Sequence, residues 1–92
     1  MADVVVTMKI MPDSPEVDLT RLESSALEKI KTFTGIDNHK VEQEPVAFGL
    51  KALKIMFVMD EAKGSTDSLE QDISSIEGVN SVEVTDVRRT IG

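Results

Sequence analysis

The sequence has no cysteine, no tryptophan and no tyrosine, and each absence excludes a class of site. Without cysteine the 92 residues can form no disulfide framework and no thiolate metal site, and they offer no thiol nucleophile. His39 is the single histidine, so zinc would lack a second nitrogen or sulfur ligand, and we expect an ordinary surface or strand residue. The three phenylalanines are too few for the aromatic platform on which a sheet stacks RNA bases.

Positive charge is also scarce. The chain contains ten Lys and Arg residues and 17 Asp and Glu residues, which gives a net charge of −7. A domain that binds nucleic acid carries a clustered excess of cations, so we expect no direct nucleic-acid contact. No apolar run reaches the roughly 20 residues that span a bilayer, and the first residues lack a basic signal region. The sequence therefore favours a cytoplasmic protein without a membrane partner.

A chain of this length has room for one core, so residues 1–92 are expected to form a single domain. We predict no enzyme activity, no metal site and no cofactor. Paired carboxylates need a concave apolar pocket to act as acid and base, which a small domain seldom provides. Lys63-Gly64-Ser65-Thr66 has the wrong order for a phosphate-binding loop, because the lysine precedes the glycine and the upstream glycine is missing.

Apolar residues alternate in two segments and recur at helical spacing in two others. Asp3–Met11 alternates and predicts a strand, and Asp18 is a candidate cap for a helix that ends at Gly35. Residues 39–46 form a weaker strand pattern, while 52–59 is apolar enough for a central strand. A second helix is expected after Thr66 and is predicted to stop at Gly78, followed by a short strand around Val82–Thr85.

The order of these elements is βαββαβ. Two right-handed βαβ units joined by a hairpin give an α+β, ferredoxin-like sandwich, in which a four-stranded antiparallel sheet carries two helices on one face. Two features are not explained by the core. Phe48 falls in a loop beside Gly49, where it is either an interface anchor or a lid over the core. Arg88-Arg89 is a cation pair near the end of an acidic chain, and such a pair is more often solvated than functional.

Several segments, in order along nearly the whole chain, resemble the archaeal translation elongation factor 1-beta family. They are Met11-Pro12-Asp13-Ser14-Pro15, Glu44-Pro45-Val46-Ala47-Phe48-Gly49-Leu50-Lys51, Ile76-Glu77-Gly78-Val79 and Val82-Glu83-Val84-Thr85-Asp86-Val87-Arg88-Arg89. The resemblance implies a ferredoxin-like exchange-factor domain that releases GDP from elongation factor 1-alpha, the GTPase that delivers aminoacyl-tRNA. That GTPase is the expected partner, and we expect the chain to act as a monomer.

The resemblance also implies which residues meet the partner. A cation near the end of the family's eukaryotic members enters the magnesium and nucleotide site of the GTPase, and it aligns with Arg89, with Arg88 beside it. The family's loop phenylalanine aligns with Phe48, followed by Gly49 and Lys51. This sequence has arginine where those members have lysine, and three further residues follow it.

Two other classes share the element order. An amino-acid-sensing regulatory domain needs a glycine-rich ligand turn after the first strand, and Met11-Pro12-Asp13-Ser14-Pro15 has no glycine. An acylphosphatase-type enzyme needs an arginine in the same turn, and none is present. The regulatory domain is the main alternative to the exchange factor.

Overall fold

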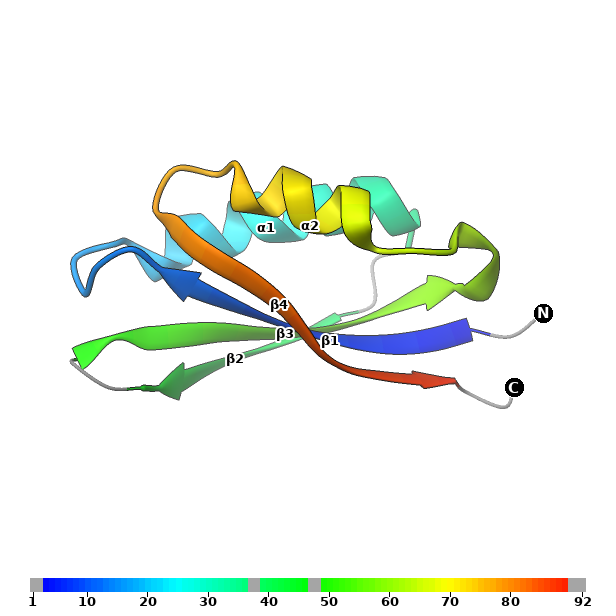
Figure 1. Ribbon diagram of the computed structural model, residues 1–92, viewed down its shortest axis with the longest axis horizontal. Helices are drawn as coiled ribbons and strands as arrows, with labels where there is room; N and C mark the ends of the chain where they lie inside the picture. The colour runs from blue at the N-terminus through cyan, green and yellow to red at the C-terminus, as the bar shows by residue number, and fades with distance from the viewer. Residues whose placement is uncertain (1–2, 37–38, 47–48, 90–92) are drawn as a thin grey trace.

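The computed structural model describes residues 3–36, 39–46 and 49–89. Its elements are β1 (Asp3–Pro12), α1 (Leu19–Thr34), β2 (His39–Pro45), β3 (Lys51–Asp60), η2 (Glu61–Lys63), α2 (Asp67–Ser74) and β4 (Val79–Arg89). The strands form one antiparallel sheet in the order β2-β3-β1-β4. Both helices lie on one side of this sheet (Figure 1). The predicted α+β, ferredoxin-like βαββαβ sandwich is confirmed.

The core lies between the helices and the two central strands. Every second residue of β1 and β3 points toward the helices, as the pleat of a strand requires. Phe57 is the largest of the fully buried side chains and is 2% exposed. The other members of the core cluster are Val6, Met8, Ile10, Leu22, Ala26, Ile30, Leu53, Ile55, Met59, Leu69 and Ile73.

The two ends of α1 follow from single residues. The Asp18 carboxylate accepts hydrogen bonds from the backbone N–H groups of Thr20 at 3.0 Å and Arg21 at 3.3 Å. These are donors that the first turn leaves without partners inside the helix. Gly35 takes the left-handed conformation, with φ 70°, and its N–H bonds the Lys31 carbonyl. Both predicted helix boundaries are confirmed.

The end of α2 differs from the prediction. The helix stops at Ser74, and Gly78 lies after a further turn instead of directly after the helix. In that turn the Ile76 N–H bonds the Ile73 carbonyl at 3.0 Å, and the Asp13 N–H bonds the Gly78 carbonyl at 2.8 Å. This last bond ties the turn to the loop after β1, and Gly78 has a φ of 97° that most residues avoid.

The last strand is much longer than predicted. β4 continues through Arg89, because β1 supplies pairing partners as far as Val4, which lies opposite Arg89. Val84 pairs with Met8 but Asp86 pairs with Thr7, so Thr85 is an extra residue, a β-bulge. After the bulge, the residues of β4 that face the helices are odd-numbered instead of even-numbered. Val84 faces the helices, whereas Asp86 and Arg88 face the other side of the sheet.

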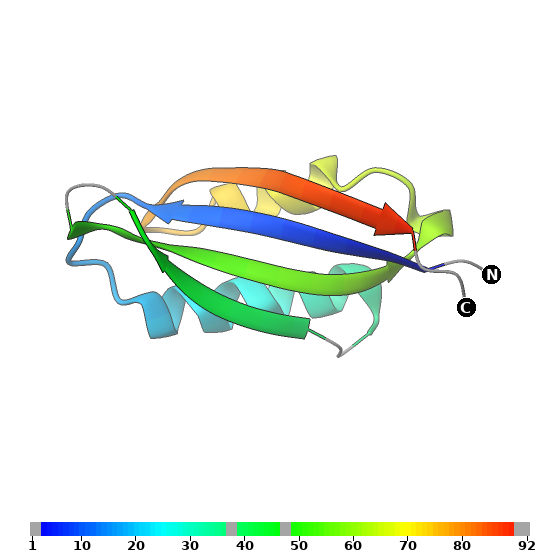
Figure 2. The same ribbon diagram turned by 90° about the horizontal axis from the view of Figure 1, so that it is seen from below.

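The side of the sheet without helices is exposed, and Figure 2 shows its four strands in front of the helix layer. We call this side the open face. By strand register it consists of Lys40, Glu42, Glu44, Asp3, Val5, Thr7, Lys9, Met11, Ala52, Lys54, Met56, Val58, Asp60, Ser81, Glu83, Asp86 and Arg88. No helix of the described part of the chain is long and apolar enough to cross a membrane.

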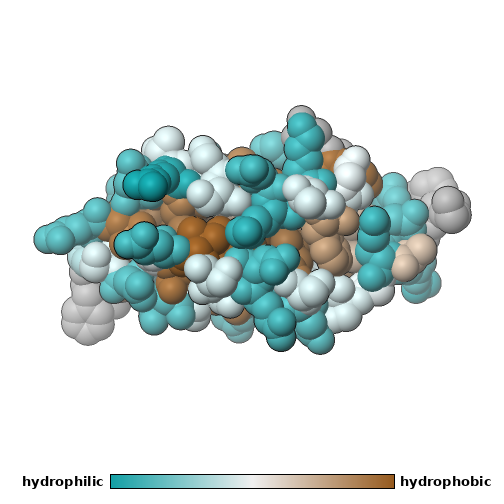
Figure 3. Space-filling view, turned by 90° about the horizontal axis from the view of Figure 1, so that it is seen from above, coloured by the Kyte–Doolittle hydropathy of each residue, from teal (hydrophilic) through white to brown (hydrophobic). Residues whose placement is uncertain are grey.

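The helix side looks different. Its surface is mostly hydrophilic, with an apolar strip along the middle (Figure 3). A groove of about 530 Å³ lies on this side, between the two helices. Phe33 and Ile76 are half-buried there, and they are flanked by charged residues such as Lys29 and Asp72.

Candidate functional site

The residues singled out in the sequence fall at opposite ends of the sheet. Gly49 and Lys51 lie where β2 turns into β3, and Lys51 pairs with Pro45. Arg88 and Arg89 end β4, opposite Val5 and Val4 at the start of β1. Figure 2 shows the loop end and the end that carries both chain termini on opposite sides of the view. Phe48 lies outside the described residues, in the part of the chain between Val46 and Gly49.

The loop end is closed by a backbone bond. The Val46 N–H donates to the Leu50 carbonyl at 2.9 Å, which brings the ends of the loop together. Gly49 has a φ of 74°, and apart from its chain neighbours no described residue has an atom within 4 Å of the position that a Cβ would take there. A side chain at Gly49 is therefore disfavoured by the backbone conformation and not by crowding.

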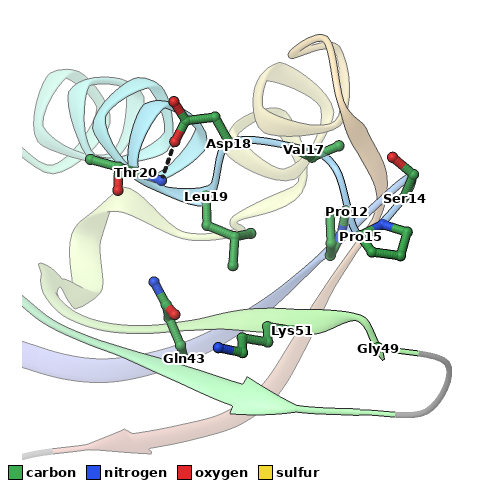
Figure 4. A pocket seen from close by; sticks show the side chains of 10 residues that line it. All are labelled: Pro12, Ser14, Pro15, Val17, Asp18, Leu19, Thr20, Gln43, Gly49 and Lys51. Atoms are coloured by element: carbon green, nitrogen blue, oxygen red, sulfur yellow. Dashed lines mark hydrogen bonds between the residues drawn. The ribbon is translucent and has the colours of Figure 1, made fainter.

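A hollow of about 360 Å³ adjoins this loop. Figure 4 shows that Lys51 and Gln43 enter it from the sheet, while Leu19 and Asp18 come from the start of α1. The Asp18 carboxylate already accepts two backbone hydrogen bonds, so it is engaged within the chain. Lys51 is exposed and gives this end of the molecule a cation beside the Phe48 loop.

At the other end, each arginine has its own carboxylate. The Arg88 Nε donates to the Asp86 Oδ2 at 2.8 Å, and the Arg89 guanidinium donates to the Glu61 carboxylate. The arginine side chains are 80% and 67% exposed. Exposed ion pairs of this kind contribute about 0 to 1 kcal/mol, so each guanidinium can leave its carboxylate at little cost.

The two guanidiniums lie on different sides of the sheet. Arg88 belongs to the open face with Asp86, and Arg89 lies on the helix side, where Glu61 of η2 follows the end of β3. Val87, also on the helix side, is 57% exposed and is the one exposed large hydrophobic residue among those described. A partner at this end would meet one cation on each side of the strand.

Other chemistry is sparse in the described part of the chain. No three His, Cys, Asp or Glu residues there lie close enough together to hold a metal ion. His39 is exposed at the first position of β2, as expected for a strand residue. Sequence reasoning missed Asp86 and Glu61. Asp86 lies two residues before Arg88 on the same face of β4, so the period of two would have found it if the strand had been extended that far. Glu61 is brought to Arg89 only by the three-dimensional fold, because the two residues are 28 positions apart.

Comparison with known proteins decides the family. The model of the EF-1 guanine nucleotide exchange domain matches residues 5–90, which include both ends of the sheet. The chain belongs to this family. It is a guanine-nucleotide exchange factor of translation elongation, as its resemblance implied.

Three relatives illustrate the match. Elongation factor 1-beta of Methanothermobacter thermautotrophicus is 51% identical over 89 residues, which cover 97% of this chain and 98% of the relative. The protein of the same name from Methanobrevibacter smithii is 43% identical over the same shares. That of Metallosphaera sedula is 41% identical over 97% of both chains. The exchange domain thus spans nearly the full length of these archaeal relatives.

Proposed function

We propose that this exchange factor releases GDP from elongation factor 1-alpha by placing an arginine of β4 in the magnesium site of the GTPase. The observation that carries the proposal is the end of β4, where Arg88 and Arg89 extend on opposite sides of one strand. Each is exposed and is held only by a surface carboxylate. Arg89 is the first candidate for the invading cation, and Arg88 is the second.

The physical effect of such a cation follows from electrostatics. Mg²⁺ neutralises the phosphates of a bound nucleotide and bridges them to the GTPase, so it is among the largest charges in that site. A guanidinium in its place supplies part of the positive charge, but it does not hold the nucleotide to the protein. Magnesium leaves first, and GDP follows.

Thermodynamic linkage then fixes the direction of the effect. A factor that binds nucleotide-free GTPase better than the GDP form weakens GDP binding, and GDP weakens factor binding by the same ratio. The factor changes the rate of exchange, while the excess of GTP sets which nucleotide rebinds. The chain breaks no covalent bond and needs no cofactor in this scheme.

The other end of the molecule supplies docking contacts. Phe48 is the proposed aromatic anchor, and Gly49 and Lys51 flank it. Aromatic residues often dominate the binding energy of an interface, whereas a flanking lysine steers association. We further propose that the chain works as a monomer in the cytoplasm, without nucleic acid or membrane.

The test is the release of labelled GDP from elongation factor 1-alpha of the same organism, with and without this chain. We expect the chain to accelerate release, and we expect added Mg²⁺ to slow the accelerated reaction. A release rate that does not depend on the chain would refute the proposed function.

A further inference from the structure

The centre of the open face carries two lysines that face each other. Lys9 of β1 and Lys54 of β3 are directly opposite in the register of the two central strands. Both residues are half-buried. Among the described residues neither ammonium group has an ion-pair partner, although the chain as a whole carries an excess of acids.

This arrangement is unfavourable for the isolated chain. Like charges directly opposite each other destabilise a strand pair. The aliphatic stems of the lysines can cover the sheet while their ammonium groups reach water. Stem packing explains long side chains at both positions, but it does not explain two charges of the same sign.

The carboxylates nearest in register leave the two lysines unneutralised. Glu42 lies opposite Lys54, but the ion pair that it forms is with Lys40 at 3.4 Å. Glu83 lies opposite Lys9, and no ion pair joins them within the described structure. The row across the sheet therefore runs acid, base, base, acid, and within the described structure neither lysine forms an ion pair with the acid opposite it.

The open face also differs in charge from the rest of the molecule. Its register positions hold four cations and six acids, a net charge of −2; they are Lys9, Lys40, Lys54, Arg88, Asp3, Glu42, Glu44, Asp60, Glu83 and Asp86. Of the net charge of −7, the larger part, −5, belongs to the helix side, the loops and the chain ends. On this face, an acidic segment meets less repulsion at the lysine pair than beside Asp3 and Asp60.

We propose that the open face, centred on Lys9 and Lys54, is a docking surface for carboxylate side chains of the GTPase partner. The inference rests on the proposed function for the identity of that partner. Arg88 continues the same surface, since it lies opposite Val5, four residues before Lys9 in β1. Four residues of a strand span about 13 Å, so one extended acidic segment can reach Arg88 and the lysine pair together.

Carboxylates fit this surface better than RNA does. The open-face positions hold no aromatic residue among those described, because Phe57 points into the core and Phe33 lies on the helix side. Single-stranded RNA gains much of its affinity from stacking on aromatic rings. Two ammonium groups without rings offer only charge, which a partner carboxylate can satisfy with charge-assisted hydrogen bonds.

The test compares two double variants of equal net charge. Lys9→Gln with Lys54→Gln removes the central pair, and Lys29→Gln with Lys31→Gln removes two cations of α1 on the helix side. Affinity for nucleotide-free elongation factor 1-alpha is measured by calorimetry at two salt concentrations, and a thermal melt reports on folding. We expect the open-face variant to bind at least tenfold more weakly, with a smaller salt dependence and an unchanged or higher melting temperature.

Lys9→Arg with Lys54→Arg keeps both charges, and we expect it to bind within about threefold of the unmodified chain. Equal losses of affinity in the two glutamine double variants would overturn the inference, since affinity would then depend only on the total charge of the chain. So would unchanged affinity of the open-face variant, or a loss confined to binding of single-stranded RNA. A further outcome is that the unmodified chain accelerates GDP release while the two glutamine double variants bind the GTPase with equal affinity. In that case only this inference fails, and the proposed function stands.

Discussion

Arg88 and Arg89 are adjacent in the sequence, yet their guanidiniums bind different carboxylates on opposite sides of the sheet. Arg88 is held by Asp86 on the open face, and Arg89 is held by Glu61 of η2 on the helix side. One strand end therefore offers two cations in two directions. A single site on a partner can receive one of them while the strand keeps its orientation, so mutation of each arginine should have a distinct effect.

We expect Arg89→Ala to slow GDP exchange by at least about tenfold, equivalent to about 1.4 kcal/mol in the activation free energy. A cation that displaces Mg²⁺ acts on nucleotide release more than on docking, so affinity for the nucleotide-free GTPase should fall less. Labelled GDP release over a range of free Mg²⁺ checks this. Raising Mg²⁺ should inhibit the unmodified chain, and chelating Mg²⁺ should narrow its advantage over the variant.

Arg88→Ala is the matched comparison, because it removes a neighbouring exposed guanidinium from the other side of the sheet. If Arg88→Ala has the larger effect on exchange, the invading cation lies on the open face. If both single variants and the double variant exchange normally, and Mg²⁺ has no influence, the chain opens the GTPase by another contact.

Glu61→Gln tests whether the carboxylate restrains Arg89. The ion pair is exposed, so its loss should change the free energy of unfolding by less than about 1 kcal/mol. A guanidinium without a competing carboxylate should reach the magnesium site more readily, and exchange should rise by up to about fivefold. The same measurement on Glu28→Gln, an exposed position of α1 outside the open face and the arginine end, controls for the change in net charge. Slower exchange in Glu61→Gln would mean that the carboxylate positions Arg89 instead of restraining it.

Phe48→Ala should weaken binding to the GTPase by about 1 to 4 kcal/mol, which is the range for an aromatic interface anchor. The fold should persist, because an aromatic interface anchor contributes to binding and not to the packing of the core. Calorimetry measures the affinity for the GTPase, and a thermal melt measures the stability of the fold. A steep fall in melting temperature with unchanged affinity of the folded fraction would make Phe48 a lid over the core.

Asp18→Ala should destabilise the domain by about 0.5 to 2 kcal/mol, because two backbone donors at the start of α1 lose their acceptor. Asp18→Asn keeps a side-chain oxygen at the same place and should retain most of the stability. Urea unfolding of the three proteins provides the measurement. Equal stability of all three would show that the cap contributes nothing at this helix.

Much of the fold could be predicted, because local rules act where the core is built. Neighbouring residues determine the apolar alternation in β1 and β3. They also determine the ends of α1 at Asp18 and Gly35. The end of α2 could not be placed, since a bond from Asp13 to Gly78 fixes the following turn across a long separation in sequence. The length of β4 could not be predicted for a similar reason. Its last residues, Arg88 and Arg89, are polar, and they belong to the strand because they pair with β1.

The candidate site was predictable only through family resemblance. Composition alone marks Phe48 and the arginine pair as unusual, but it assigns neither a role. The faces of the two arginines depend on the bulge at Thr85, and a strict period of two from Val82 and Val84 would have pointed Arg88 toward the helices. The lysine pair at the centre of the open face depends on the register between two strands that are more than 40 residues apart in the sequence.

The closeness of the two chain ends has a practical consequence for handling the protein. Val4, near the start of β1, lies opposite Arg89 at the end of β4. Figures 1 and 2 mark both chain ends at the same end of the sheet. An affinity tag fused to either terminus would stand at the end that is proposed to enter the GTPase. Tethering through an engineered thiol on the outer side of α1 would leave that end, the loop end and the open face accessible in a binding measurement.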